Sequence, residues 1–181
     1  MLYAVDGAGT RILPVKQTRA LCPGCKQPVI ARCGDVNADH WAHVTGCECD
    51  PWHEPETRWH VNWKMQFEEH CREIVLPPHR ADVCATRVHT DGEARMVIEL
   101  QHSPIEPAEI EERENFYFDK CNHMCWVIDA REIIGNFEFG SSDKFDGGAS
   151  IRTNFRWKWF RKSWGTVLVH LGISILGMNS G

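Results

Sequence analysis

The sequence lacks the features that would place it among secreted, membrane-spanning or fibrous proteins. Its first residues, MLYAVDGAGT, hold no basic segment followed by an apolar run, which a signal peptide would need. The longest apolar stretch, TVLVHLGISILGM, is too short for a membrane helix and is interrupted by His170, Gly172 and Gly177. We therefore predict no membrane contact and a cytoplasmic location, in a bacterial or phage-infected cell.

Acidic residues are missing from one end of the chain. The 181 residues carry 20 Lys and Arg and 25 Asp and Glu, yet residues 152–181 hold five basic residues and no acidic one. This segment predicts a local contact with nucleic acid, because its aromatic residues could stack on bases while its cations meet phosphates. An amphipathic strand with buried aromatic residues explains the same pattern. The basic residues are Arg152, Arg156, Lys158, Arg161 and Lys162.

Cysteine is present in an odd number, nine, which does not suit a scaffold of disulfides. We predict a reduced, intracellular protein in which some cysteines bind metal. Cys22-Pro-Gly-Cys25 has the spacing of a zinc knuckle, and tetrahedral zinc needs two more nitrogen or sulfur ligands. The predicted Zn²⁺ ligands are Cys22, Cys25, His43 and Cys47, with His40 as the main substitute. The alternative is a set of reduced cysteines beside surface histidines.

The middle of the chain has helical periodicity. Trp59, Trp63 and Phe67 recur every four residues and predict a helix over 55–71. A second stripe on this helix would place three polar side chains on nearly one face. These side chains are Glu56, His60 and Lys64.

Strand patterns surround a second helix. We expect strands over 73–76, 81–88, 94–101 and 123–129, with the Asp-Gly turn at 90–93 joining the second and third. The second helix should begin at Pro107, since proline is tolerated at the first helical position, and fade by Cys121. Residues 140–150 predict a loop, and 167–178 predict a hairpin. This order of elements is typical of an α/β protein with a mixed sheet.

Two carboxylates are the best candidates for chemistry. Asp82 and Glu99 would lie on the adjacent strands of the predicted hairpin, and Gln101 would share a face with Glu99. Carboxylates that converge at a sheet edge predict a site for Mg²⁺ or Mn²⁺, which can polarise a phosphate and activate water. Glu73 is a further candidate acid. Two solvated acids on an exposed strand are the alternative.

Short motifs in a consistent order carry a family resemblance. They are Cys22–Cys25, His40–His43, the residues Glu56, His60 and Lys64, then Arg80–Val83, Ile98–Ser103, Glu112–Arg113 with Tyr117, and Trp126–Ile128. This set resembles the competence protein CoiA-like family. Its members join an N-terminal zinc-ribbon-like region to a nuclease domain of the PD-(D/E)xK, restriction-endonuclease-like fold.

The resemblance implies the fold and its division. It implies an α/β protein, a restriction-endonuclease-like mixed sheet flanked by helices, with a small N-terminal zinc-binding β module. Residues 1–53 would form the zinc-ribbon-like module and 54–139 the nuclease-like core. Residues 140–181 would supply a loop, the basic aromatic strip and a C-terminal hairpin.

The resemblance also implies roles for residues. Asp82 and Glu99 take the positions of the family's acidic pair, and Gln101 stands in place of the usual lysine. An amide supplies a dipole but no charge, so Lys64, Arg80 or Arg113 would supply it, or the metals would, or the site is inactive. Glu56 and His60 match the family's helix carboxylate and histidine. Arg113 is a further expected contact to nucleic acid.

These expectations lead to a metal-dependent nuclease that cleaves or processes DNA, single-stranded DNA included. The catalytic residues would be Asp82, Glu99, Gln101, Glu56, His60 and Lys64. One alternative is a non-catalytic DNA-binding accessory protein on the same fold. Another is a protein-interaction module, such as a phage or host-defence factor. Nothing in the sequence identifies a protein partner.

Overall fold

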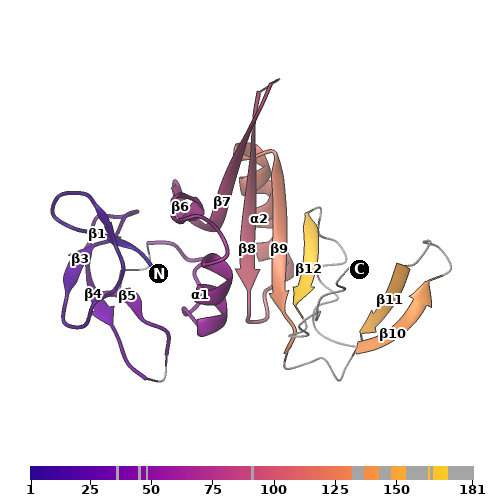
Figure 1. The fold of residues 1–181 in the computed structure, drawn as a ribbon, viewed down its shortest axis with the longest axis horizontal. Coiled ribbons are helices and arrows are strands. Elements are labelled where there is room, and N and C mark those ends of the chain that lie inside the picture. Colours follow the sequence, from indigo (N-terminus) through magenta and orange to yellow (C-terminus); the bar gives the residue numbers. More distant parts are fainter. Residues whose placement is uncertain are drawn as a thin grey trace, which may run out of the picture.

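The computed structural model describes residues 1–131 apart from 36, 45, 48 and 91, together with 137–142, 148–153, 163 and 165–170. In this part of the chain two five-stranded sheets and one two-stranded sheet are present. Figure 1 shows the N-terminal sheet on one side of α1 and the larger sheet on the other. The predicted fold class, an α/β protein with a mixed sheet and an N-terminal β module, is confirmed.

Short antiparallel strands build the N-terminal sheet, in the order β2-β1-β3-β4-β5. Trp41, buried on the last strand, packs with Val29 and Cys22 in a small core of its own. Three further cysteines of the Cys-rich loops, Cys25, Cys33 and Cys49, pack against the edge of this core. The strands are β1 (Ala4–Val5), β2 (Arg11–Ile12), β3 (Arg19–Leu21), β4 (Pro28–Arg32) and β5 (His40–His43).

The larger sheet is mixed, in the order β12-β9-β8-β7-β6. Its first three strands in the chain are antiparallel neighbours, whereas β8, β9 and β12 run parallel to one another. The carboxyl ends of three strands therefore lie at one edge. The strands are β6 (Arg72–Leu76), β7 (His79–His89), β8 (Gly92–Gln101), β9 (His123–Asp129) and β12 (Thr166–His170).

Two α-helices cover opposite faces of this sheet. The helix α1 (Arg58–Lys64) contributes Trp59 and Trp63 to one apolar cluster, and α2 (Pro107–Lys120) contributes Ile110 and Tyr117 to the other. A 3₁₀ turn, η1 (Glu69–Cys71), leads into β6. No helix in the described ranges has the length and apolar character that a bilayer crossing requires.

The structure corrects two predicted elements. The helix expected over 55–71 begins only after Thr57, whose hydroxyl accepts the His60 amide, and ends at Lys64. Phe67 lies beyond the end of the helix but still packs against the core. The spacing of the aromatic residues therefore predicted burial correctly and the length of the helix incorrectly. Residues 140–150 were expected to form a loop. The ends of this range instead belong to two strands that pair with each other, β10 (Phe137–Ser142) and β11 (Gly148–Thr153).

The remaining predictions on this part of the chain have mixed outcomes. The strand over 123–129 and the helix start at Pro107 are confirmed. The hairpin expected over 167–178 begins as β12, which pairs in parallel with β9, and its second half lies outside the described residues.

Candidate active site and metal-binding group

The strands β7 and β8 stop pairing where the two predicted carboxylates lie. Their register runs from His89↔Gly92 to Val83↔Ile98. Beyond it, the Asp82 amide donates to Oε1 of Glu99 at 3.2 Å and the Leu100 amide donates to Oδ2 of Asp82 at 3.0 Å. Side-chain oxygens thus replace the backbone ladder, and the structure brings Asp82 and Glu99 together.

A buried lysine lies against these acids. Nζ of Lys64 is 3.0 Å from Asp82 Oδ1, 2.9 Å from Glu56 Oε1 and 2.9 Å from Glu73 Oε1, and its side chain is 3% exposed. Burial alone would lower the pKa of Lys64, but the three carboxylates outweigh it and hold the pKa well above its usual value. Lys64 is therefore a permanent cation inside the site.

The two central carboxylates differ in charge. Burial, and then the charge of Asp82, raise the pKa of Glu99 to about 7, although Arg113 NH1 lies 3.2 Å from Glu99 Oε2 and opposes the shift. Burial also disfavours ionisation of Asp82, but Lys64, His60 and the Leu100 amide hold its pKa below the usual value. Asp82 is thus ionised near neutrality, while Glu99 is close to its titration point.

A cavity of about 30 Å³ lies among these groups. Its volume suits one or two species of the size of a water molecule. Carboxylate oxygens are what Mg²⁺ and Mn²⁺ prefer, so the donor set fits such an ion. Any ion must compete with Lys64 and Arg113, which already face the two acids. The lining includes Glu54, Glu56, His60, Lys64, Asp82 and Glu99.

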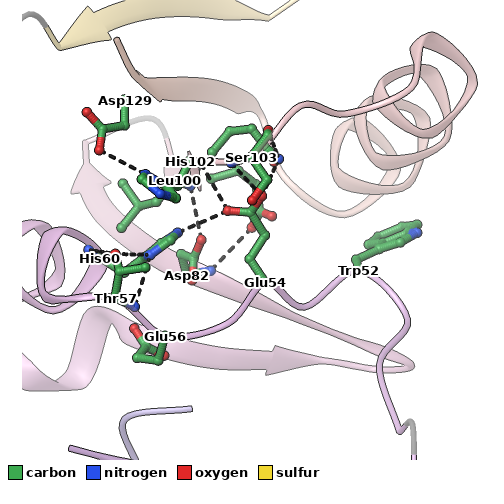
Figure 2. Close-up of polar contacts among 12 residues, drawn as sticks. Trp52, Glu54, Glu56, Thr57, His60, Asp82, Leu100, His102, Ser103 and Asp129 are labelled. Atoms are coloured by element: carbon green, nitrogen blue, oxygen red, sulfur yellow. Dashed lines mark hydrogen bonds and ion pairs between the residues drawn. The ribbon is translucent and has the colours of Figure 1, made fainter. Parts of the chain in front are cut away.

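Glu54 organises the site, and sequence reasoning missed it. Figure 2 shows its carboxylate between the end of β8 and α1. Oε1 accepts from Gln101 Nε2 at 2.6 Å and from the Ser103 amide at 2.9 Å, and Oε2 accepts from the His102 amide at 3.0 Å. Burial opposes its ionisation, yet these bonds and His60 keep its pKa below the usual value. No motif marks this acid; its spacing of two from Glu56 was the only signal.

Gln101 is held firmly by this acid. Its Nε2 also donates to the Ser103 carbonyl at 2.7 Å, whereas its Oε1 is buried with no partner among the described residues. The amide therefore cannot move freely, and it leaves one acceptor for a group not present in the structure.

Both nitrogens of His60 have partners. Nδ1 is 2.8 Å from the Thr57 hydroxyl and Nε2 is 3.2 Å from Glu54 Oε2. Burial lowers the pKa of His60, but Glu54 and the nearby acids outweigh it and raise the pKa. Glu56 precedes the helix rather than sharing its face, and it joins the cluster through Lys64. The structure thus brings the three predicted residues together by a different route.

Glu73 has a role in holding the two sheets together. Its fully buried carboxylate accepts the amides of Leu2 at 2.8 Å and Tyr3 at 3.0 Å, in addition to the Lys64 ammonium. Both of its oxygens are therefore used within the protein.

Arg113 also acts inside the protein. Its side chain is buried against Glu99, Glu109 and the Trp52 carbonyl, which leaves no surface for the predicted contact with nucleic acid. Of the other predicted contacts, Arg152 lies on β11, and its side chain is not described. The rest lie outside the described residues, namely Arg156, Lys158, Arg161 and Lys162.

Four donor atoms cluster at the edge of the N-terminal sheet. They belong to Cys22, Cys25, His43 and Cys49, and all lie within 4.8 Å of one another. Cys25 Sγ is 3.3 Å from His43 Nε2, and Cys22 Sγ is 3.7 Å from Cys49 Sγ. Three sulfurs and one nitrogen form a ligand set that structural zinc uses. Among the described residues this is the one group with three or more such donors so close together.

This group corrects one predicted ligand. Cys49 completes it in place of Cys47, whose Sγ lies 4.0 Å from Cys25 Sγ at the margin. His40, the predicted substitute, is not in the group; it is three residues from His43 on β5, and its Nδ1 lies 2.9 Å from the Ala38 carbonyl.

Comparisons with known proteins match two family models to the chain. The family model for the competence protein CoiA N-terminal domain matches residues 10–51, and the model for its nuclease-like domain matches residues 57–143. The two matches together cover about 70% of the chain, in the family's order. No curated protein and no solved structure matches it.

Proposed function

Because the chain belongs to the competence protein CoiA-like family and carries its nuclease-like domain, we propose that it is a metal-dependent nuclease acting on DNA phosphodiesters. The observation that supports this most is the separation of β7 and β8 at Asp82 and Glu99, which opens the sheet at a small acidic cavity. Acids that have replaced a backbone ladder at a strand end are suited to holding a ligand rather than to stabilising a sheet.

Asp82 and Glu99 would hold Mg²⁺ or Mn²⁺ in this cavity. Glu56, which lines the same cavity and pairs with Lys64, is a further acid that could approach the ion. Such an ion, when bound, supplies positive charge to the phosphate and lowers the pKa of bound water. The chain itself contributes fixed charge and orientation. Glu99, which is close to its titration point at pH 7, can lose its remaining proton as a cation binds.

Lys64 would replace the lysine that Gln101 does not provide. Its ammonium contacts Asp82 directly and keeps its charge despite burial. A cation in this place can meet the negative charge that develops on a phosphate in the transition state. Gln101, fixed by Glu54, would orient the attacking water or the scissile phosphate with its free oxygen. His60 would support this arrangement through Glu54.

One observation favours the second candidate, a non-catalytic DNA-binding accessory protein. Lys64 and Arg113 already neutralise the central acids, and a site that never binds metal would look the same. Zn²⁺ at the Cys/His group would then be the one metal, and the basic strip would carry DNA binding. The division at residues 53 and 139, the cytoplasmic location and any protein partner stay predictions.

The test is a cleavage assay on linear, circular and single-stranded DNA with Mg²⁺, Mn²⁺ or EDTA. We expect metal-dependent cleavage that falls at least about a hundredfold in Glu99→Gln. Glu112→Gln is the matched control, since Glu112 is exposed on α2. If the protein binds DNA without metal and cleaves none of the substrates, the nuclease interpretation is wrong and the accessory-protein interpretation replaces it.

A further inference from the structure

Two histidines and an acid meet at the edge where the parallel strands end, and a third histidine, His60 of α1, lies beside them. His102 directly follows β8, Asp129 is the last residue of β9, and His170 is the last residue of β12. Trp59 of α1 lies among them, with its ring centroid 6.3 Å from that of His102 and 6.2 Å from that of His170. This edge is the one that carries Asp82 and Glu99, so the cluster adjoins the candidate active site.

Within the cluster, His102 is oriented by a buried carboxylate. Its Nδ1 is 2.9 Å from Asp129 Oδ2, and the side chain of Asp129 is 2% exposed while that of His102 is 35% exposed. Burial disfavours ionisation of Asp129, but bonds from Arg131 and His102 outweigh it and lower its pKa. An ionised carboxylate only accepts, so Nδ1 carries a proton and Nε2 points away from Asp129. Nε2 has no partner among the described residues.

The imidazole of His102 lies beside the cavity. Its backbone amide donates to Glu54 Oε2, the same oxygen that is 3.2 Å from His60 Nε2. The rings of His60 and His102 are 6.1 Å apart, and His60 lines the cavity with Asp82 and Glu99. Figure 2 shows His102 between Asp129 and the Glu54–His60 pair. His60 cannot transfer protons freely, because both of its nitrogens are engaged; His102 keeps one nitrogen for a substrate.

The charged and titratable groups around His102 come from every neighbouring element. Asp129 ends β9 and Arg131 follows it by two residues, Glu54 precedes α1, His60 lies on α1 and His170 ends β12. Arg131 balances the charge of Asp129, and the Trp59 indole occupies Nδ1 of His170 at 2.9 Å. Of the three histidines, His102 alone combines an orienting carboxylate, solvent access and a nitrogen without a partner in the described structure.

We propose that His102 is a catalytic residue, the general acid that protonates the leaving oxygen, and that Asp129 is its positioning residue. The inference rests on the proposed nuclease function. Water attacks phosphorus and loses its proton to solvent, while the P–O bond to the leaving oxygen breaks. For this step the His102 ring starts as the imidazolium, with Nδ1–H held by Asp129; Nε2 gives its proton to that oxygen, which leaves the ring neutral, and a proton from solvent then restores the imidazolium. A positioned acid of this kind contributes about 10²–10⁴-fold to rate.

A sulfur substitution in the substrate separates this role from a structural one. A thiolate leaves without needing a proton, so a DNA strand with a 3′- or 5′-bridging sulfur at the scissile bond bypasses a general acid. We expect His102→Gln to cleave ordinary DNA at least about a hundredfold more slowly than wild type does. On the sulfur-bridged strand, the cleavage rates of the variant and of wild type should differ by less than about threefold. His123→Ala, at the far end of β9, should match wild type on both.

Asp129→Asn gives a second measurement. It should lower the rate on ordinary DNA by about tenfold, move the pH–rate profile and leave the sulfur-bridged rate unchanged. Equal losses of His102→Gln on both substrates, with melting temperatures unchanged, would overturn the general acid and leave the nuclease standing. A wild type that cleaves neither substrate would overturn both proposals at once.

Discussion

The Cys/His group and the carboxylate site present metal-binding atoms in opposite electrostatic settings. In the N-terminal module, three thiols and an imidazole converge and contact one another, and burial, followed by the nearby charge of Arg80, lowers the pKa of His43. In the core, Asp82 and Glu99 already face Lys64 and Arg113. The first arrangement has little reason to stay together without an ion, whereas the second is complete as a set of ion pairs. One metal should therefore hold the fold, and the other should serve only the reaction.

Removal of zinc should give the largest effect. We expect about one zinc per chain, and we expect Cys49→Ser to lose it and unfold the N-terminal module, because metal binding there is folding free energy. The small core around Trp41 offers little else to hold these strands. Metal analysis and thermal melting measure this.

Cys47→Ser is the matched control for that result, since Cys47 lies at the margin of the group. It should keep its zinc and its melting temperature. If Cys47→Ser lost zinc and Cys49→Ser kept it, the ligand assignment would be reversed. A zinc content near zero in the wild-type protein would contradict the claim that a metal ion stabilises the N-terminal module.

Lys64→Met should have the next largest effect. It removes the shared partner of the buried Glu56 and Glu73 and the partly buried Asp82, so that Arg80 and the N-terminal ammonium are cations that remain near them, and breaking a buried ion pair costs about 3–5 kcal/mol. Urea unfolding at pH 7 measures the loss. Lys120→Met, exposed at the end of α2, should change stability by less than about 0.5 kcal/mol. Similar values for both variants would show that the core does not depend on its internal cation.

The pH dependence of stability should distinguish the two carboxylates. Burial and Asp82 raise the pKa of Glu99 to about 7, so below pH 7 the folded state keeps a proton that the unfolded state releases near 4.5. Stability from Glu99 is therefore present at low pH and lost as the pH rises toward 7. The free energy of unfolding of wild type relative to Glu99→Gln should fall by roughly 1–2 kcal/mol between about pH 5 and pH 7.

Asp82→Asn should give a shallower pH dependence between pH 5 and pH 7 than Glu99→Gln. The pKa of Asp82 is lowered, so its contribution is present above the unfolded value near 3.8 and is lost only as the pH falls through its folded pKa. Between pH 5 and pH 7 the titration of Asp82 itself adds no slope, and the difference between wild type and Asp82→Asn should change only by the part of the Glu99 shift that the charge of Asp82 causes, which is smaller than the change for Glu99→Gln. Parallel slopes for both variants would contradict the unequal charge states.

Gln101→Lys should have the smallest effect. The amide lies 2.6 Å from Glu54 Oε1 and 2.7 Å from the Ser103 carbonyl, and an ammonium can use the same two acceptors. We expect stability within about 1 kcal/mol of wild type and metal-dependent cleavage within about tenfold. Complete loss of cleavage in a folded variant would show that the oxygen of Gln101 is required.

Parts of this architecture could be predicted because a local pattern determines them. Alternation places Glu99 and Gln101 on one face, Asp-Gly joins β7 to β8, and Pro107 begins α2. Other parts depend on contacts between distant segments. Glu54 carries no motif, and only the fold brings it to the end of β8. Cys47 and Cys49 are two residues apart, so spacing alone could not choose between them. Arg113 was predicted both to supply charge to the site and to contact nucleic acid, and spacing alone could not show that packing against Trp52 buries it.

The central claim is that Asp82 and Glu99 bind a divalent ion although Lys64 and Arg113 already face them. Titration calorimetry of Mn²⁺ into zinc-saturated protein at constant ionic strength tests it most directly. The account predicts binding to wild type and to Glu112→Gln, with affinity at least about tenfold weaker in Asp82→Asn and in Glu99→Gln. Equal Mn²⁺ affinity in all four proteins would contradict it.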